Sequence, residues 1–428
     1  MRSRAQFDLI ILSGLFALSL ALRLLFTFKS HGEIMPPDGV LYSDIAIHLL
    51  HGEGFTQNVR SYFIVVPPFY PIFLAFVYMI FGVGNSTAII VIQALLGALT
   101  TVPIYKIAEE LFNHWAGLIS GLLFSIYSLS IYWSGFVLSE TLFTLLVVIL
   151  TYVFMCLLRP QATYLTAILA GLIWGLTSLT RPHFLFFVPF LWLLLFIVRR
   201  HQSLKLAGIS TLLLLITIAP WISYLYKEYG CIIPIASHGG LNLWLGNSSF
   251  TNPDRYYSST LYANNPLFTT QLKEGMNLPP CEQNRFFLNA ALQFILSFPL
   301  SFVVNTYEKF NLLTKSVDLH LNLFRNPFLD RIINATDEWL LILILSDLVL
   351  STLPRWDFKR NQILLWLILY YSIIISVNVI VSQGRYRLPI MPHVAMYGGL
   401  AISELLYGLA IGVKSVIHLV HKYGGKKI

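Results

Sequence analysis

Charged residues and cysteines are both scarce in this chain. Only 11% of its 428 residues are Asp, Glu, Lys or Arg, whereas soluble proteins carry about 25% charged residues. This scarcity excludes a soluble enzyme and a disordered chain, because both depend on a polar surface. The three cysteines are too few for a cysteine-based metal cluster or a disulfide scaffold.

The chain is instead rich in long apolar runs. Hydrophobic residues make up 56% of the sequence, and a helix that spans a bilayer needs about 20 mostly apolar residues. The sequence therefore predicts an all-α polytopic membrane protein with about ten transmembrane helices. The ten runs are residues 8–27, 86–106, 116–134, 140–158, 162–180, 184–198, 206–226, 335–353, 361–381 and 387–412.

Lysines and arginines indicate how these helices are oriented. Three basic groups lie within residues 199–205, 355–360 and 414–427, and cytoplasmic loops carry an excess of such residues. Ten crossings from a cytoplasmic N-terminus place all three groups and the C-terminus in the cytoplasm, so we expect a plasma-membrane protein. The net charge of +8 then reflects topology, not a nucleic-acid partner. The first run lacks a cleavage site and is predicted to be a retained anchor.

Two further apolar segments, 66–82 and 286–304, do not fit this count. The first begins with prolines, and the second contains Asn, Gln and Pro299. We expect both to lie at the membrane interface, because counting either as a crossing would place basic loops outside. The chain then forms one membrane domain, 1–428, with two long external segments at 28–85 and 227–334, where function is expected.

The first external segment contains a short predicted helix within residues 36–55. Asp38 is expected to be its N-cap, and Gly52 and Gly54 are expected to end it. Apolar residues recur at helical spacing and form a stripe suited to the membrane surface. That stripe consists of Leu41, Ile45, His48 and Leu49.

Asp38 and Asp44 lie on different faces of this helix, since six residues at 100° per residue separate them by about 240°. Asp38 is either a simple cap or a functional carboxylate, and Asp44 is either a solvated residue or a functional one. The segment by itself leaves both alternatives open.

A set of motifs in a characteristic order resembles the C-type (GT-C) integral-membrane glycosyltransferases. The most similar branch contains the protein O-mannosyltransferases and the lipid A aminoarabinose transferase, that is, glycosyltransferase family 39. The motifs are PPDGVLYSDIAIHLLHGEGF, PPFYPIFLAF, IQALLGALTTVPIY, LSETLFTLL, SLTRPHFLFFVP, GGLNLWLGN and GRYRLPIMP. The resemblance implies a GT-C bundle with juxtamembrane helices. It also implies transfer of a sugar from a polyprenyl-phosphate carrier on the far side of the membrane, with no nucleotide cofactor.

The resemblance also implies roles for particular residues. Asp38 matches the catalytic Asp of the first external loop, and Tyr42 matches a position that follows it. The family often has a second acidic residue where this chain has Gly39, so Asp44 is a candidate for that part. It often has a Lys where this chain has Val66, so a phosphate contact is expected from elsewhere, with Arg60 as the candidate.

Several other polar residues are expected on the external side. Glu140 is either an acidic residue near the sugar or a metal, or an ordinary residue at a helix start. Arg181, Arg385 and Arg387 oppose the positive-inside tendency and either bind the donor phosphate or anchor to lipid headgroups. Among metal ligands, Glu140, His183 and His238 are weak candidates.

The motif GGLNLWLGN predicts a tight turn that lines a sugar or acceptor cleft. Its Asn247 is a candidate substrate contact, and Trp244 is a candidate for stacking on a sugar. Cys231 and Cys281 share this external segment and form either a disulfide or a free pair.

These observations predict a glycosyltransferase with Asp38 as general base. Its partners are a polyprenyl-phosphate sugar and membrane lipid, with a lipid, glycan or protein hydroxyl as acceptor and a divalent metal as an open question. The alternative is a transporter or flippase of a lipid-linked substrate, for which ionisable residues such as Asp347 and Glu404 within the membrane would be the signal.

Overall fold

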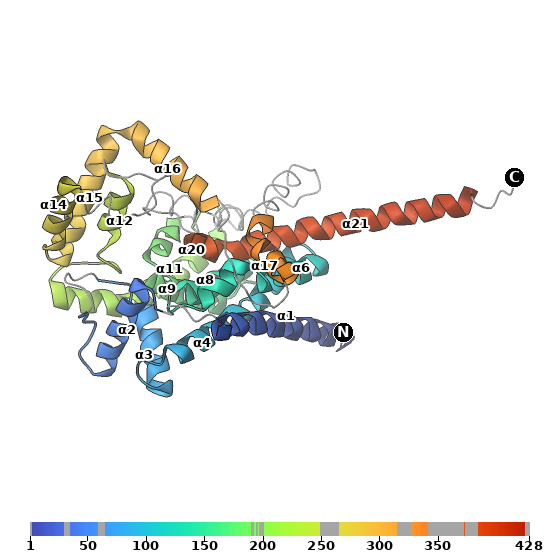
Figure 1. The fold of residues 1–428 in the computed structure, drawn as a ribbon, viewed down its shortest axis with the longest axis horizontal. Coiled ribbons are helices and arrows are strands. Elements are labelled where there is room, and N and C mark those ends of the chain that lie inside the picture. Colours follow the sequence, from blue (N-terminus) through green and yellow to red (C-terminus); the bar gives the residue numbers. More distant parts are fainter. Residues whose placement is uncertain are drawn as a thin grey trace.

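The computed structural model describes residues 2–29, 35–58, 65–189, 201–248, 265–314, 327–340 and 384–423, together with residues 192, 193, 196 and 372. All regular structure within these residues is helical, as Figure 1 shows. The predicted all-α class is therefore confirmed.

Four stretches of helix are long and apolar enough to cross a membrane. Two bent helix pairs pass the same test jointly, so the described residues contain four to six candidate spans. The four are α1 (Arg2–Lys29), α4 (Ser86–Leu99) continued by α5 (Thr101–Leu111), α8 (Glu140–Leu158) and α11 (His201–Tyr229). The pairs are α6 (His114–Ser125) with α7 (Ser128–Ser134), bent by 49°, and α15 (Pro280–Ser297) with α16 (Pro299–Thr314), bent by 107°.

The predicted runs agree with these helices in part. Runs 8–27, 86–106, 140–158 and 206–226 each fall within a candidate span. Run 116–134 is broken at the α6–α7 bend, and run 162–180 forms the 17-residue α9 (Tyr164–Thr180). Run 184–198 begins in the 3-10 helix η1 (Pro182–Phe187), and run 387–412 falls in η2 (Leu388–Ile390) and α21 (Met391–Tyr423). Run 335–353 is described only up to residue 340, and run 361–381 only at residue 372.

The segment 66–82 forms α3 (Phe69–Phe81), whose 13 residues are fewer than a span requires. The segment 286–304 is divided between α15 and α16 at Pro299. That α3 and the α15–α16 pair lie at the interface stays a prediction.

The first-loop helix is present as α2 (Pro37–Leu50), but its start differs from the prediction. Pro36 is the N-cap, and Asp38 lies inside the first turn. The first helical residue is Pro37, and proline suits this position because a backbone N–H there would have no partner within the helix. The prediction that Asp38 is the N-cap is therefore wrong. The helix ends before Gly52 and Gly54 as predicted, and both glycines have left-handed φ angles, +76° and +78°.

The apolar stripe of α2 faces protein, so its predicted contact with the membrane surface is wrong. Leu41 and Ile45 are buried in a cluster with Leu241, Trp244 and Phe287. These partners belong to α12 (Gly239–Gly246) and α15. The periodicity of α2 shows that the stripe needs an apolar partner, but the helices that supply it lie about 200 residues further along the sequence.

The motif GGLNLWLGN is the helix α12 and not the predicted turn. Its Gly240 packs so tightly on α15 that a Cβ atom would lie 2.2 Å from the Asn284 carbonyl oxygen. Trp244 is buried, with its ring 5.2 Å from that of Phe268 in α14 (Pro266–Met276). It is therefore not available to stack on a sugar.

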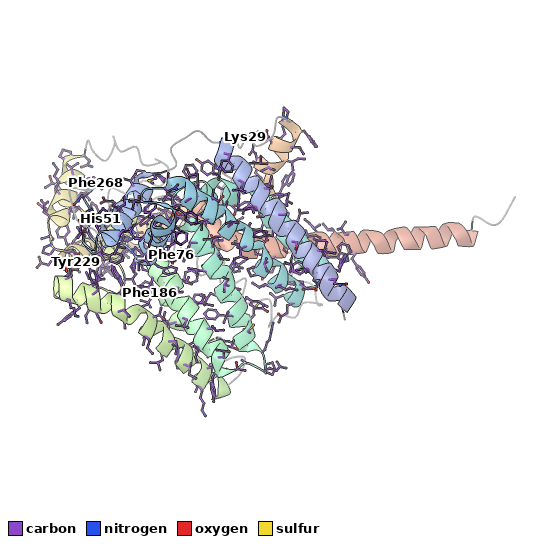
Figure 2. All side chains as sticks on the ribbon, turned by 90° about the horizontal axis from the view of Figure 1, so that it is seen from below. Lys29, His51, Phe76, Phe186, Tyr229 and Phe268 are labelled. Carbon is purple, nitrogen blue, oxygen red and sulfur yellow. A yellow bond between two sulfur atoms is a disulfide. The ribbon has the colours of Figure 1, made fainter. Side chains whose placement is uncertain are left out.

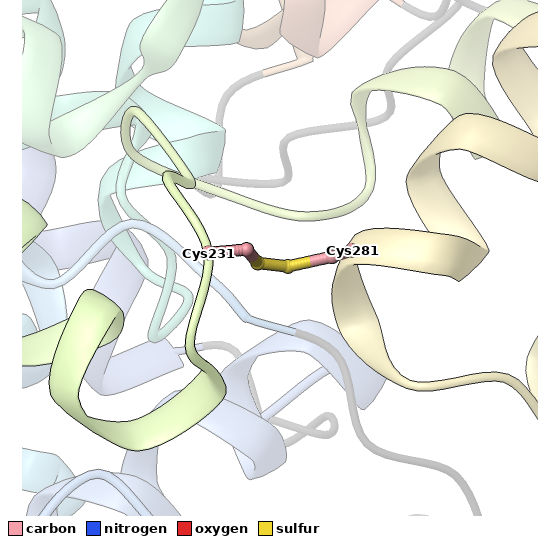
Figure 3. Close-up of a disulfide and its surroundings, with 2 residues drawn as sticks. All are labelled: Cys231 and Cys281. Carbon is pink, nitrogen blue, oxygen red and sulfur yellow. A yellow bond between two sulfur atoms is a disulfide. The ribbon is translucent and has the colours of Figure 1, made fainter.

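Cys231 and Cys281 form a disulfide, shown in Figure 3. The bond joins the segment that follows α11 to the beginning of α15. In Figure 2, His51, Tyr229 and Phe268, which mark the end of α2, the end of α11 and α14, gather at the same end of the molecule. The two predicted external segments therefore come together there.

We predict that maleimide labels one cysteine, Cys156, in denatured but unreduced protein, because Cys156 is the free cysteine and the other two are bonded. Labelling of all three before reduction would contradict the pairing.

The disulfide between Cys231 and Cys281 closes a loop with a sequence separation of 50. Cys281→Ser should therefore lower the free energy of unfolding by up to about 4 kcal/mol.

Candidate active site

Four charged side chains from segments far apart in sequence meet at one place. They are Asp38 in the first turn of α2, Glu140 at the start of α8, Arg181 at the end of α9 and Arg385 in α20 (Gly384–Arg387). We refer to these four residues as the carboxylate–arginine cluster. Sequence analysis expected all four on one side of the membrane, and the structure brings them together.

Glu140 is the buried centre of the cluster, with 2% of its side chain exposed. Its Oε1 accepts a 2.7 Å hydrogen bond from Arg181 Nη2, and Arg385 Nε lies 4.0 Å from the same oxygen. The start of α8 also favours a carboxylate, because the helix dipole is positive at its N-terminal end. Among the described residues, Glu140 Oε2 has no hydrogen-bond partner although it is buried. That oxygen therefore keeps an unused acceptor capacity inside the cluster.

Asp38 is the accessible carboxylate of the cluster. Arg385 Nη2 donates to its Oδ2 at 3.3 Å, and 40% of its side chain is exposed. One carboxylate is thus buried among the cations while the other can be reached from outside. The two are chemically distinct, although both are paired with arginine.

Tyr386 holds both arginines in place. Its hydroxyl oxygen accepts a 3.0 Å hydrogen bond from Arg385 Nη2. The guanidinium carbons of Arg385 and Arg181 lie 4.9 and 5.8 Å from the centre of its ring. Such cation–π contacts limit the motion of the guanidinium groups. Sequence analysis did not select Tyr386, although its place between Arg385 and Arg387, two arginines predicted on the external side, was a signal.

Tyr42 borders the cluster on α2. Burial, followed by the negative field of Asp38, raises the pKa of its hydroxyl, although Arg181 and Arg385 oppose part of this shift. Tyr42 is therefore a hydrogen-bond donor and not a base. Its ring meets that of Tyr70 edge to face at 5.2 Å.

Other predicted site residues have partners of their own. Asp44 Oδ2 accepts from the Asn58 backbone N–H at 2.7 Å and so holds the chain that follows α2. Arg387 is buried, pairs with Asp337 and donates to the Leu313 carbonyl at 2.8 Å. Arg60 lies outside the described residues.

The remaining predicted polar residues lie around α12. His238 Nδ1 is 3.3 Å from the Val65 carbonyl oxygen, and Asn247 Oδ1 accepts from Lys309 Nζ at 3.3 Å. Lys309, a buried cation that also donates to the Gly246 carbonyl at 2.9 Å, was not selected from the sequence. A single lysine in an apolar helix was the available signal.

A divalent metal does not fit the carboxylate–arginine cluster. Two guanidinium groups already occupy the space around Glu140, and they would repel a dication. His183 is neutral, since burial, and then Arg181, lower its pKa to about 3, but it joins no group of three metal-type ligands. Within the described ranges, the one such group is Asp8, Glu109 and His114, from α1, α5 and α6. That group begins near the N-terminus of α1, whereas Asp38 follows its C-terminal end.

Comparisons with known proteins agree with the resemblance seen in the motifs. Residues 65–224 match the family model described as dolichyl-phosphate-mannose-protein mannosyltransferase. The archaeal oligosaccharyltransferase AglB from Archaeoglobus fulgidus, in complex with an inhibitory peptide and a dolichol-phosphate, superposes with a TM-score of 0.59. The alignment has 16% identity and covers 99% of this chain and 53% of that one. The chain has the GT-C fold.

Further structures were also matched. AglB in complex with Zn and sulfate gives a TM-score of 0.56 at 16% identity, over 96% of this chain and 51% of that one. ArnT from Cupriavidus metallidurans bound to undecaprenyl phosphate gives a TM-score of 0.44 at 12% identity, over 96% of this chain and 79% of that one. The chain thus spans about half the length of the AglB chains. No curated protein matches its sequence.

We predict that Arg181→Met lowers the free energy of unfolding by about 3–5 kcal/mol, because it leaves Glu140 buried without its 2.7 Å partner. The measurement is unfolding in detergent. Arg159→Met is the control, since the Arg159–Glu110 pair is largely exposed and such pairs contribute about 0–1 kcal/mol. Equal losses in the two variants would contradict the central place of Glu140.

Proposed function

We propose that this protein is a membrane glycosyltransferase that moves a sugar from a polyprenyl-phosphate donor to a hydroxyl acceptor. The observation that carries the proposal is the carboxylate–arginine cluster, in which the accessible carboxylate of Asp38 is paired with Arg385 and the buried carboxylate of Glu140 is paired with Arg181. The GT-C fold and the match of residues 65–224 support the same class of reaction.

The two arginines would bind the donor phosphate. A guanidinium forms paired, charge-assisted hydrogen bonds with phosphate oxygens. In the cluster the charges of Asp38 and Glu140 balance those of Arg181 and Arg385. An arriving phosphate would compete with Asp38 for Arg385 at 3.3 Å more readily than with Glu140 for Arg181 at 2.7 Å. Donor binding would thereby release Asp38 toward the acceptor.

Asp38 would act as the general base. The acceptor oxygen attacks the anomeric carbon of the sugar, and its proton passes to the Asp38 carboxylate. The bond from the anomeric carbon to the phosphate oxygen breaks, and polyprenyl phosphate leaves as an anion stabilised by the arginines. Glu140 keeps those arginines in place. No metal ion is required in these proposed reaction steps.

The sugar and the acceptor are not specified by these residues. We propose that the acceptor reaches Asp38 from the side formed by the two predicted external segments, because Asp38 is the exposed member of the cluster. Of the two residues that would signal a transporter, Glu404 is exposed on α21, and Asp347 lies outside the described residues.

We predict that Asp38→Asn lowers the turnover number by about 10²- to 10⁴-fold, the usual contribution of a general base. Donor affinity should be retained or raised, since a neutral asparagine competes less with the donor phosphate for Arg385 than the Asp38 carboxylate does. The assay is mass-spectrometric detection of polyprenyl phosphate released from a panel of lipid-linked sugars. Glu228→Gln is the control, an exposed acidic residue at the end of α11. Turnover close to wild type in Asp38→Asn would remove Asp38 from its role.

For Arg385→Ala we predict donor binding weakened by about tenfold to a hundredfold, the loss expected for hydrogen bonds to a charged group. Binding of polyprenyl phosphate to purified protein measures this directly. Arg285→Ala is the matched control, because Arg285 is an exposed arginine on α15. If the two variants bind the donor equally well, Arg385 does not contact its phosphate.

A further inference from the structure

A buried glutamine is linked to the carboxylate–arginine cluster only through other residues. Its hydrogen-bond partners are a tyrosine hydroxyl and two backbone carbonyls. Gln93 lies in α4 and is fully buried. Its Nε2 donates to the Phe136 carbonyl at 2.6 Å and to the Ser134 carbonyl at 3.3 Å. Its Oε1 accepts from the Tyr70 hydroxyl at 2.6 Å. Because carbonyl oxygens can only accept, these partners require the amide orientation observed.

The segment that Gln93 binds leads directly to Glu140. Residues 135–139 form an irregular turn between α7 and α8. The turn is buried around Val137, Leu138 and Ser139. Such a turn lacks the repeating backbone bonds of a helix, so the Gln93 amide supplies hydrogen bonds at its beginning. Ser139 ends the turn as the N-cap of α8, and its side chain makes no capping hydrogen bond to the first turn of that helix.

The same turn also sets the position of Asp38. At Gly39, a Cβ atom would lie 2.4 Å from the Val137 carbonyl oxygen, so α2 rests directly against the turn. Any side chain at residue 39 would move α2 away from it. This contact explains why glycine follows Asp38 in this chain. Residue 39 has no acidic side chain, so the second carboxylate of the site is Glu140, the residue that directly follows the turn.

Gln93 is joined to α2 from the other side as well. The Tyr70 side chain that donates to Gln93 also supports the Tyr42 ring, at 5.2 Å. A single amide therefore contacts two supports of the cluster, the turn before Glu140 and the Tyr70 ring that packs on Tyr42 of α2. Arg385 lies between the two carboxylates, 3.3 Å from Asp38 and 4.0 Å from Glu140, so their separation decides whether it can bridge them.

We propose that Gln93 is a positioning residue that sets the separation of Asp38 and Glu140 through the 135–139 turn, and that Gly39 is required for the same close contact. This proposal rests on the proposed function for its effect on turnover. Its geometric part stands independently of that function, because it concerns the turn itself.

The test combines turnover with backbone hydrogen exchange. Gln93→Met keeps the length of the side chain but leaves the Phe136 and Ser134 carbonyls without their donor. The expected result is a turnover number reduced by about 10- to 100-fold, as for a misplaced catalytic group, with the donor KM unchanged. Exchange of the amides in 135–143 should become faster. Gly39→Ala, which acts from the other side of the turn, should reduce turnover in the same way.

Two control variants match these changes. Gln283→Met replaces another buried glutamine, whose Nε2 donates to Met276 Sδ at 3.3 Å. Gly14→Ala adds a methyl group where nothing lies within 4 Å. Neither should alter turnover or the exchange of 135–143.

The outcomes separate the two proposals. Unchanged exchange in Gln93→Met, or faster exchange with wild-type turnover, would overturn the positioning role. A rise in the donor KM as large as the fall in the turnover number would also overturn the positioning role, because it would indicate a general loss of structure at the site. If wild-type protein releases no polyprenyl phosphate from any donor, the proposed function fails, and the exchange of 135–143 by itself decides whether Gln93 and Gly39 hold the turn.

Discussion

The buried carboxylate of Glu140 is the constraint on which the site depends. A carboxylate removed from water is strongly unfavourable unless cations and hydrogen bonds compensate it. Arg181 supplies a 2.7 Å bond, and Arg385 adds a second positive charge at 4.0 Å. Since these residues come from the starts or ends of α8, α9 and α20, satisfying one charge brings three helix ends together. Arg385 then extends the network to Asp38 on α2.

The arrangement suits transfer of a sugar from a phosphate carrier because it separates two tasks. The buried carboxylate orients cations, and the exposed carboxylate can receive a proton. In a metal-dependent site a dication would neutralise the leaving phosphate, whereas in this cluster two guanidinium groups, which lie over the ring of Tyr386, supply the positive charge. Guanidinium groups remain charged at any physiological pH, so the phosphate site would not depend on metal supply.

Much of the fold could be predicted from the sequence, because apolar runs of about 20 residues have few alternatives in a membrane. The members of the cluster could also be predicted. Asp38 follows from the motif, and Arg181 and Arg385 follow from their predicted place on the outer side, where arginine is uncommon. Two predictions failed because the deciding contact came from a distant part of the chain. The α2 stripe and Trp244 are both covered by helices of the second predicted external segment.

Supporting residues were hidden for the same reason. Asp337 neutralises Arg387, and Gln93 holds a turn about 40 residues further along the sequence. A polar residue within an apolar run was visible at residue 93, but its partners are backbone carbonyls, which have no signature in a sequence. The motif at residues 36–55 likewise shows a glycine after Asp38 without showing the Val137 carbonyl that requires it.

The most direct test of this account is an experimental structure of the protein in lipid with polyprenyl phosphate bound. The account predicts phosphate oxygens within hydrogen-bond distance of Arg181 and Arg385, with Asp38 turned away from Arg385 and Glu140 still paired with Arg181. A phosphate bound elsewhere, with the Asp38–Arg385 pair intact, would contradict the assignment of this cluster as the donor site.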